Sequence, residues 1–257
     1  MALADSSQRV SHRGSWPGKI TFRRGWSRAD ARPWNDTTNG ANLRLVRGGA
    51  SFLAACTTSL LALGTDAVIS PPLPASARGA WRDAGYTPYV DLALMRLSLD
   101  EQPKSPSHLV VEADMAISEL LGIDAAAFDA FWRFDEFGLA EAIDATGKSS
   151  ILIIRNGNGD PAGFAIVGYG NAISYLQRVA VHPDWQGHGM GRSLVRVAAR
   201  KARSAGAQVM LLNTQNDNRP AIGLYESEGF VLLPEALALL RSTGSWPEAP
   251  EQNPAQR

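Results

Sequence analysis

Cysteine is nearly absent from this sequence, and neither sign of charge prevails. Cys56 is the one cysteine among 257 residues, so no disulfide can form within the chain, as suits a reducing compartment. We interpret Cys56 as a small buried side chain rather than a reactive thiol. The 25 basic residues balance the 25 acidic ones, which excludes a strong overall field for nucleic acid or a membrane. Any basic surface must therefore be local.

Long apolar runs and clusters of metal ligands are also missing. The most apolar stretch, residues 52–63, contains Thr57, Thr58 and Ser59 and is too short to span a bilayer. The first forty residues contain no apolar segment typical of a signal peptide, so we expect a cytoplasmic protein without a membrane anchor. Because no Cys/His cluster and no paired carboxylates occur, we expect no metal site.

The chain length suits two compact lobes. "DEQPKSPSH", residues 100–108, places two prolines among polar residues, and we predict a linker at residues 101–108. An N-terminal lobe would then occupy residues 1–100, and an α/β domain residues 109–241. Residues 242–257 are rich in proline and polar side chains, which predicts a disordered tail.

The N-terminal lobe begins with a basic segment. Residues 1–50 contain nine arginines or lysines against three aspartates. We interpret this segment as a solvated and partly disordered start, and a nucleic-acid-binding arm is the alternative.

Strands and helices alternate in residues 109–241, which predicts an α/β fold. Aromatic and apolar residues recur at helical spacing in residues 124–146, and Gly138 is expected to divide this run into two short helices. "SSILIIRNGNGDPAGFAIVGYG" then predicts a strand, a tight turn and a second strand, as in a β-hairpin. The next expected elements are a strand at 172–183, a helix at 191–204, a strand at 208–213, a helix at 219–228 and a strand pair around 230–240.

A faint internal repeat relates the two lobes. Glycines bound helix-like intervals of equal length at 49–64 and 191–206, and an apolar strand follows each interval. An aromatic residue then stands four positions before a Gly-aromatic pair, Trp81 before "GY" and Tyr225 before "GF". We infer that the N-terminal lobe is an incomplete copy of the C-terminal lobe, with a chance alignment as the alternative. The first copy has "RLVRGG" in place of a glycine-rich loop, so we expect it to have lost any anion site.

A glycine-rich stretch, "WQGHGMGRSL" at residues 185–194, places Gly187, Gly189 and Gly191 before a predicted helix. Free backbone N–H groups at a helix start bind anions, and glycine lets a phosphate approach the backbone closely. A P-loop would have lysine after its last glycine, where this stretch has arginine. A dinucleotide site would need G-x-G-x-x-G and a later acidic residue, but residues 186–216 contain no aspartate or glutamate.

The same interval contains five cations, so we expect the loop to receive its anion from outside the protein. Arg192 in the first helical turn is unfavourable to the helix dipole unless an anion lies beside it. We interpret Arg196, Arg200 and Arg203 as a solvated helix face. His188, inside the loop, either donates to phosphate or faces solvent.

At this point two motifs resemble a known family. "LQRVAVHPDWQGHGMGRSLV" is similar to the acyl-CoA signature of the GNAT superfamily of N-acetyltransferases, with Gln186, Gly189 and Gly191 at its motif positions. "NRPAIGLYESEGF", residues 218–230, resembles the second signature, Asn-x-x-Ala-x-x-Leu-Tyr followed by Gly-Phe. The resemblance covers residues 109–241 and extends to the N-terminal lobe only as a degenerate copy. It implies a tandem fold with a mixed, mostly antiparallel sheet flanked by helices.

The resemblance also implies a reaction, the transfer of an acetyl group from acetyl-CoA to an amine by direct attack in a ternary complex. In such an enzyme the backbone of Val179, Ala180 and Val181 would bind the pantetheine arm and polarise the thioester carbonyl. Asn218 would position the cosubstrate, and Tyr225 would protonate the departing thiolate, although its ring is alternatively a core residue. The pyrophosphate would lie on the loop residues Gln186, Gly187, His188, Gly189, Met190, Gly191 and Arg192.

The proton acceptor departs from the pattern of the most similar members. Ribosomal-protein alanine acetyltransferases have a glutamate five residues before the motif asparagine, where this chain has Asn213, which cannot act as a base. The substitutes that we considered are Asp135, Glu136, His182 and Glu226. The aromatic group in the region that lines the acceptor site in the family is first interpreted as core packing: Phe128, Phe131, Trp132, Phe134 and Phe137.

The leading hypothesis is therefore an acetyl-CoA-dependent N-acyltransferase that acts on an amine of a small molecule or a protein. One alternative is a non-catalytic acyl-CoA-binding protein, consistent with the missing glutamate. A second alternative is a nucleic-acid-associated module that uses the basic start, although we do not expect nucleic acid as a partner.

Overall fold

The chain forms two compact units in the computed structural model, which describes residues 9–242. The first unit holds residues up to Leu92 together with those from Glu235, and the second holds Ala93–Pro234. The boundary therefore lies before the predicted linker at 101–108. The predicted tail at 242–257 lies outside the described residues apart from its first residue.

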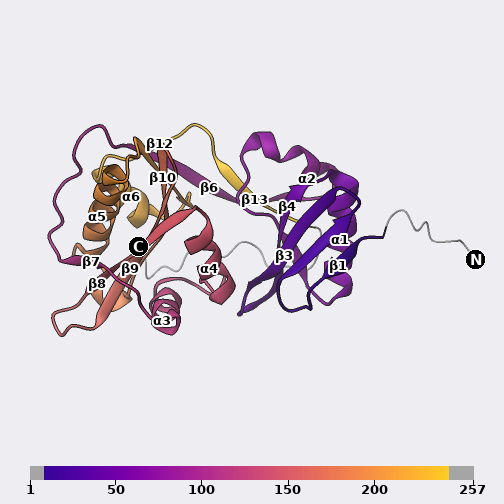
Figure 1. Ribbon diagram of the computed structural model, residues 1–257, viewed down its shortest axis with the longest axis horizontal. Coiled ribbons are helices and arrows are strands. Elements are labelled where there is room, and N and C mark those ends of the chain that lie inside the picture. Colours follow the sequence, from indigo (N-terminus) through magenta and orange to yellow (C-terminus); the bar gives the residue numbers. More distant parts are fainter. Residues whose placement is uncertain (1–8, 243–257) are drawn as a thin grey trace, which may run out of the picture. The chain divides into compact units, whose positions relative to one another are not determined.

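The second unit contains a mixed sheet with helices on both faces (Figure 1). Its strands lie in the order β6, β11, β10, β9, β8 and β7, and β12 also pairs with β6. The β10–β11 pair is parallel, and the pairs from β7 to β10 are antiparallel. These elements are β7 (Val110–Glu112), α3 (Ile117–Ala127), α4 (Glu136–Asp144), β8 (Lys148–Arg155), β9 (Pro161–Tyr169), β10 (Ile173–Val181), a 3₁₀ turn η3 (Pro183–Trp185), α5 (Met190–Ser204), β11 (Val209–Gln215), α6 (Arg219–Ser227) and β12 (Val231–Leu232).

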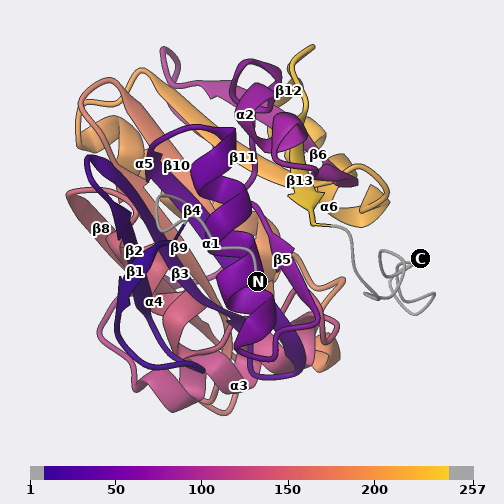
Figure 2. The ribbon, with the colours of Figure 1, turned by 90° about the vertical axis from the view of Figure 1, so that its right-hand side faces the viewer.

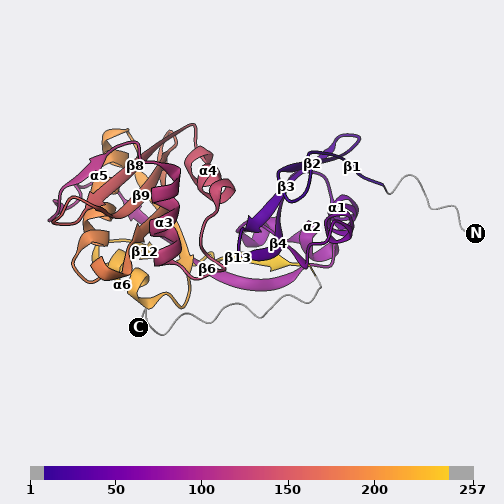
Figure 3. The ribbon, with the colours of Figure 1, turned by 90° about the horizontal axis from the view of Figure 1, so that it is seen from below.

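Successive side chains along each strand point to opposite faces of the sheet, and they form two hydrophobic cores in this unit, one on each face. On β8, Leu152 and Ile154 pack in the core beneath α5, whereas Ile153 packs in the core beneath α3 and α4. Figure 3 shows α5 and α3 on opposite sides of β8 and β9. Ala198, Ala199 and the other small residues on the buried stripe of α5 let the helix lie close to the strands.

The first unit repeats part of this architecture. Its strands lie in the order β1, β2, β3, β4, β5, β13 and β6, with β4 and β5 parallel. Helix α1 lies across β3, β4 and β5 (Figure 2) and buries Phe52, Leu53 and Leu60 in the core. The elements are β1 (Ser11–Arg13), β2 (Ile20–Arg24), β3 (Ser27–Asn35), β4 (Thr38–Arg47), α1 (Ala50–Ala62), β5 (Ala67–Ile69), a 3₁₀ turn η2 (Ala75–Ala77), α2 (Gly79–Asp83), β6 (Thr87–Ser98) and β13 (Leu237–Arg241).

The geometry confirms the internal repeat. The Trp81 and Tyr86 rings lie 4.9 Å apart, and the Tyr225 and Phe230 rings lie 5.6 Å apart. In each copy the second aromatic residue donates its backbone N–H to the carbonyl of the first at 3.0 Å. The glycine before it has φ 90° at Gly85 and 91° in the other copy, the left-handed conformation that ends a helix with glycine.

The last strand of each repeat is divided between the two units. Strand β6 contributes residues 87–92 to the first unit, where it pairs with β13, and residues 93–98 to the second, where it pairs with β12. After the second aromatic corner, β12 stays in the second unit and β13 enters the sheet of the first, between β5 and β6. The two strands expected around 230–240 are present, but they pair with β6 instead of with each other.

The predicted break at Gly138 was wrong. Gly138 lies buried in the first turn of α4, where its N–H donates to the capping carboxylate of Asp135 at 2.7 Å. Glycine suits this position because a Cβ would lie 3.1 Å from the Phe134 ring. The chain instead leaves the helix after Ala127, so the aromatic run 128–134 connects α3 and α4.

The division of the last strands predicts a long-range effect on stability. Leu240 on β13 is fully buried in the core of the first unit, although it follows the whole second unit in sequence. Leu240→Ala is therefore expected to lower the free energy of unfolding by about 2–5 kcal/mol. Hydrogen exchange should quicken in β4 and β5, the strands of the core that Leu240 fills.

Leu232→Ala on β12 is the control, because that side chain is 60% exposed. It should change the free energy of unfolding by no more than about 0.5 kcal/mol. Faster exchange in β10 and unchanged exchange in β4 and β5 for Leu240→Ala would contradict the assignment of β13 to the first unit.

Candidate active site

The parallel strands β10 and β11 separate part-way along their length. They pair only at Ile173–Val209, Ser174–Met210 and Tyr175–Leu211. A bulge in β10 follows at once, between Leu176 and Arg178, and β10 continues to Val181 with β9 as its remaining neighbour. The backbone groups of residues 177–181 that point away from β9 therefore border an opening in the sheet.

Val179, Ala180 and Val181 lie at this opening. Their backbones pair with β9 on one side, and their side chains alternate between the two cores. Ala180 is 1% exposed in the core beneath α3 and α4, and Val181 is 9% exposed in the core beneath α5. The side chains thus fix the strand, and the free backbone edge is what these residues can offer to a ligand.

The glycine loop follows directly and is shaped by two left-handed glycines. Gly187 has φ 75° and Gly189 has φ 80°, and Gly189 is the residue from which α5 begins. The Gln186 side chain ties the loop to the strand end by donating to the carbonyl of Val181 at 3.0 Å. His188 lies on the exposed side, with Nδ1 2.8 Å from the carbonyl oxygen of Gln186.

The backbone N–H groups of residues 187–192 make no hydrogen bond within the described part of the chain. A Cβ at Gly187 would meet no atom within 4 Å, so the space over the loop is open. Six donors, among them those of Met190 and Gly191, thus lie without a described partner at the positive end of the α5 dipole. This arrangement suits a phosphate group.

The Arg192 side chain does not await an external anion, which corrects one expectation. Its guanidinium bonds to Glu228 and, at 2.8 Å, to the Ser227 hydroxyl, both at the end of α6. Glu228 also holds Arg196 at 2.7 Å and is 4% exposed. The acid that balances the first turn of α5 is therefore supplied by tertiary packing, and the local sequence around Arg192 could not show it.

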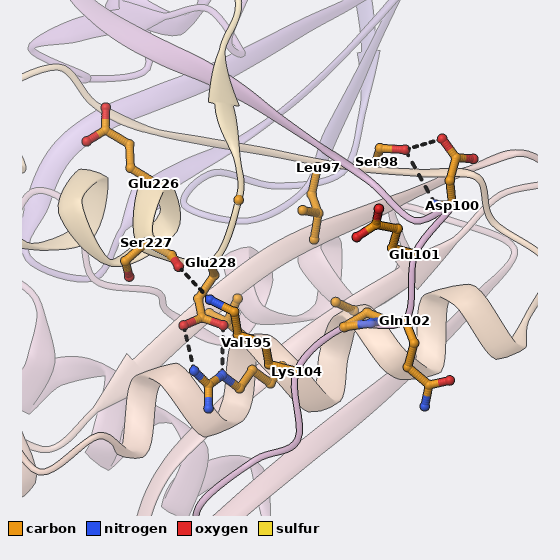
Figure 4. A pocket seen from close by; sticks show the side chains of 14 residues that line it. Leu97, Ser98, Asp100, Glu101, Gln102, Lys104, Val195, Glu226, Ser227 and Glu228 are labelled. Atoms are coloured by element: carbon orange, nitrogen blue, oxygen red, sulfur yellow. Dashed lines mark hydrogen bonds and ion pairs between the residues drawn. The ribbon is translucent and has the colours of Figure 1, made fainter.

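Arg196 and Arg200 on α5 are half-buried and not a solvated face, which corrects part of another expectation, whereas Arg203 is exposed. They donate to backbone carbonyls of residues 99–105 and hold that segment along the helix: Arg196 to Ser105, Arg200 to Pro103, and Arg203 to Leu99 and Asp100. The predicted linker is thus bound to α5 over much of its length. A pocket of about 550 Å³ lies between this segment, α5 and the end of α6 (Figure 4), and neither residues 179–181 nor Tyr225 line it.

Tyr225 lies on α6 with its ring packed against Phe230 at the edge of the core beneath α5. Burial raises the pKa of its phenol to about 12, against a smaller opposing effect of the Arg178 charge. The phenol is therefore protonated at neutral pH and able to donate a proton. Asn218 caps the same helix, where its side-chain oxygen accepts from Ala221 N at 3.1 Å.

The residues considered as proton acceptors are mostly engaged elsewhere. Asp135 caps α4, and His182 caps the 3₁₀ turn η3 with Nδ1 3.5 Å from Asp184. Glu136 and Glu226 are exposed, and Glu226 lines the pocket of Figure 4. Asn213 is exposed on β11.

Arg178 and Asp124 organise the predicted aromatic region, and the sequence analysis missed both. Arg178 Nε and Nη2 donate to the fully buried Asp124 carboxylate at 2.7 and 2.9 Å. The guanidinium lies over the Phe128 ring and over the Phe134 ring, 3.4 and 4.0 Å from their centroids. Phe131 is buried against Trp132 with the rings 4.8 Å apart. In the sequence, the only sign of this ion pair was a charged residue, Arg178, beside the apolar Val179 in the first motif.

Two other classes of site were searched in the described residues. Within residues 9–242, no three His, Cys, Asp or Glu side chains are grouped to hold a metal ion. None of the helices that the structure describes has the length and apolar character needed to cross a membrane. In the first unit, only Gly48 and Gly49 join β4 to α1, so the long loop of the second unit has no counterpart there.

The described chain therefore consists of two related α/β units, of which the second carries unpartnered backbone donors at the start of α5 beside an open strand pair. Residues 117–230 match the model of the acetyltransferase (GNAT) family, and this part of the chain is a GNAT acetyltransferase domain. This finding agrees with the resemblance drawn from the two motifs.

Individual relatives agree with this assignment. Streptothricin acetyltransferase of Streptomyces lavendulae is 37% identical over 108 residues, which are 41% of this chain and 56% of that protein. Mycothiol acetyltransferase of Thermobifida fusca is 28% identical over 214 residues, 80% of this chain and 64% of that protein. The chain thus spans less than two thirds of either relative. A tandem GNAT protein from the clavulanic acid biosynthesis pathway has the same fold, with a TM-score of 0.62 and 14% identity over 90% of this chain and 83% of that one.

Glu228, which bonds to both Arg192 and Arg196, is expected to contribute to stability in a pH-dependent way. Burial alone would raise the pKa of Glu228, but the Arg196 and Arg192 guanidiniums outweigh it and hold the pKa below its ordinary 4.5. A lowered folded-state pKa means that the stabilisation is complete above the unfolded pKa and is lost as pH falls through the folded one. Glu228→Gln should therefore lower the free energy of unfolding by about 3 kcal/mol at neutral pH.

Urea unfolding at about pH 7 and about pH 4 measures this effect, and the deficit of Glu228→Gln should shrink at the lower pH. Glu226→Gln, an exposed glutamate on the same helix, should change little at either pH. An equal deficit of Glu228→Gln at both pH values would show that the ion pairs do not cause it.

Proposed function

We propose that the second unit transfers an acetyl group from acetyl-CoA to an amine, by direct attack in a ternary complex. The observation that carries the proposal is the opening between β10 and β11 beside six unpartnered backbone donors and a protonated Tyr225. These are the three groups that an acyl-CoA thioester needs: a backbone edge for its arm, donors for its phosphates and an acid for its sulfur.

The residues present fit the cosubstrate. The pyrophosphate would lie on the N–H groups of residues 187–192, where Gly187 and Gly189 leave the backbone accessible. The backbone edge of Val179–Val181 would hold the pantetheine arm and polarise the thioester carbonyl, a contribution of about 3 kcal/mol to the transition state. Asn218 contributes by fixing the start of α6 and so the position of Tyr225.

In the transfer step, the neutral amine attacks the carbonyl carbon, and the bond from that carbon to sulfur breaks. The electron pair leaves with the sulfur, and Tyr225 donates its proton to the thiolate. Burial suits Tyr225 to this role because it keeps the phenol protonated at working pH. The amine loses one proton as the amide forms, and solvent water carries a proton back to the Tyr225 phenolate, so atoms and charges balance and the enzyme is restored.

The named relatives suggest which acceptors to test first. One is a streptothricin acetyltransferase and another a mycothiol acetyltransferase, so a small molecule with a free amino group is the proposed acceptor class. Thiol release from acetyl-CoA should be measured against streptothricin, free amino acids and simple diamines. Calorimetry should measure acetyl-CoA binding beside it. Binding without thiol release on any amine would favour a non-catalytic acyl-CoA-binding protein.

Tyr225→Phe tests the proposed acid. It should lower kcat by about a hundredfold or more while leaving the affinity for acetyl-CoA within about threefold. Tyr169→Phe is the matched control, because it also removes a hydroxyl from a half-buried tyrosine on the same core. Undiminished kcat in Tyr225→Phe would remove the assignment.

Gly187→Asp tests the anion site. A carboxylate at this open position should repel the pyrophosphate and weaken acetyl-CoA binding by about tenfold or more. Gly159→Asp is the control: Gly159 also has positive φ, 88° against 75°, and also has no atom within 4 Å of a Cβ, but it lies in the β8–β9 turn. Calorimetry on the wild type should give one acetyl-CoA per chain, because the first unit lacks the loop. Two sites, or equal losses in both variants, would contradict the proposal.

A further inference from the structure

His108 lies beside the start of α5, although it belongs to the segment before β7. A Cβ on Gly189, the residue from which α5 begins, would lie 3.6 Å from His108 Cε1 and 3.9 Å from Ser107 Oγ. Both residues therefore border the loop whose backbone N–H groups the proposed function assigns to the pyrophosphate. They lie outside residues 117–230, the part of the chain that matches the GNAT family, so the family match does not assign them a role.

The segment that leads to His108 is held along α5. Arg203, in the last turn of the helix, donates to the carbonyl of Leu99 at 2.9 Å, and Arg196 donates to that of Ser105 at 2.9 Å. Figure 4 shows this segment beside the helix. The predicted linker thus follows α5 from its last turn toward its first, and the backbone bonds fix the direction from which His108 reaches the loop.

Ser193 fixes the end of this segment to the first turn of α5. This serine is fully buried, and its Oγ accepts the backbone N–H of Ser107 at 3.3 Å and that of His108 at 3.2 Å. The same Oγ lies 3.2 Å from His108 Nδ1 and 3.2 Å from Ser107 Oγ. Because two N–H groups occupy both of its lone pairs, its own hydrogen is left for one of these two acceptors. Ser193 therefore contacts both the backbone and the ring of His108.

The two ring nitrogens of His108 have different surroundings. Nδ1 lies 3.2 Å from the hydroxyl of Ser107 and 3.2 Å from that of Ser193. A hydroxyl that donates to Nδ1 leaves the hydrogen of the neutral ring on Nε2, and the protonated ring carries one there as well. Nε2 makes no hydrogen bond to the described residues, and it adjoins Cε1, the atom nearest to the Cβ position of Gly189. The ring thus has a donor available at the edge beside the loop.

The arginine of the loop is engaged elsewhere, so a second side chain has a role to fill there. Arg192 bonds to Glu228 and, at 2.8 Å, to the Ser227 hydroxyl. Backbone N–H groups and a helix dipole provide only partial positive charge, whereas a pyrophosphate carries full negative charges. A protonated His108 provides a full positive charge beside Gly189, and a bond from a charged donor is stronger than one from a neutral donor.

We propose that His108 is a cosubstrate-binding residue, whose Nε2 donates to the phosphate that lies on the start of α5. Ser193 is its positioning residue. The inference rests on the proposed use of acetyl-CoA and adds to that site a side chain from the predicted linker, which lies outside both motifs.

Calorimetry on the full chain with coenzyme A tests this contact. His108→Ala should weaken binding by about tenfold or more, and His108→Gln, which keeps an N–H donor without the charge, should weaken it less. Ser193→Ala keeps the ring but not its anchor, so it should also give a smaller loss than His108→Ala. The control is His12→Ala, which changes an exposed histidine on β1 and should leave the affinity within about twofold of the wild type.

A second readout separates contact with the ligand from a structural role. The Nε2 resonance of His108 in the wild type should shift when coenzyme A is added. It should stay unchanged with pantetheine, which has the thiol-bearing arm but no phosphate. An unshifted resonance with coenzyme A would overturn the proposal, as would an unchanged affinity of His108→Ala. If the wild type binds coenzyme A but transfers acetyl to no amine, the proposed function fails and these measurements still decide the role of His108. If the wild type does not bind coenzyme A, both proposals fail.

Discussion

The candidate site depends on one limit to hydrogen bonding: the parallel pairing of β10 and β11 ends at Tyr175 and Leu211. If the pairing continued, the backbone N–H and C=O groups of the next residues would bond to β11 and could not bond to a ligand. A bulge in β10 follows. The side chains of the next residues alternate between two cores, and one edge of their backbone stays unpaired. The glycine loop then delivers the start of α5 to the same place.

The first unit shows that strand separation is not sufficient. Its parallel pair ends in the same way, at Asn42 and Ile69. Only two residues then lead into α1, and a Cβ on Gly48 would lie 2.8 Å from the Phe52 ring. An aromatic side chain thus fills the region beside the helix start. The first unit therefore has the parallel strand pair of the second without its glycine loop.

Local patterns predicted much of the fold. The hairpin β8–β9, the strand β10 and the helices α5 and α6 each carry their signal within a few residues: alternation, a turn of glycine and asparagine, or an apolar stripe. The loop was equally readable, because Gly187 and Gly189 are needed for left-handed backbone. Gly138 misled us because its reason is steric contact with Phe134, which no helical pattern contains.

The charged pairs were beyond local patterns. Arg178 and Asp124 are 54 positions apart, and Arg192 and Glu228 are 36 apart. The sequence shows where the arginines are but not their partners, because tertiary packing decides which arginine binds a carboxylate and which binds a backbone carbonyl. The expectation that Arg192 waits for a phosphate failed for this reason, whereas the backbone donors around it stay available.

The division of the last strands between the units bears on how this protein is made. On the ribosome, the first unit emerges with the place between β5 and β6 unfilled, and the strand that fills it is β13. Ala238 and Leu240 complete its core, and they are synthesised after the entire second unit. The N-terminal half of the chain therefore cannot finish folding first, as domains made early usually do. The first unit completes its core only after residues 237–241 have been synthesised.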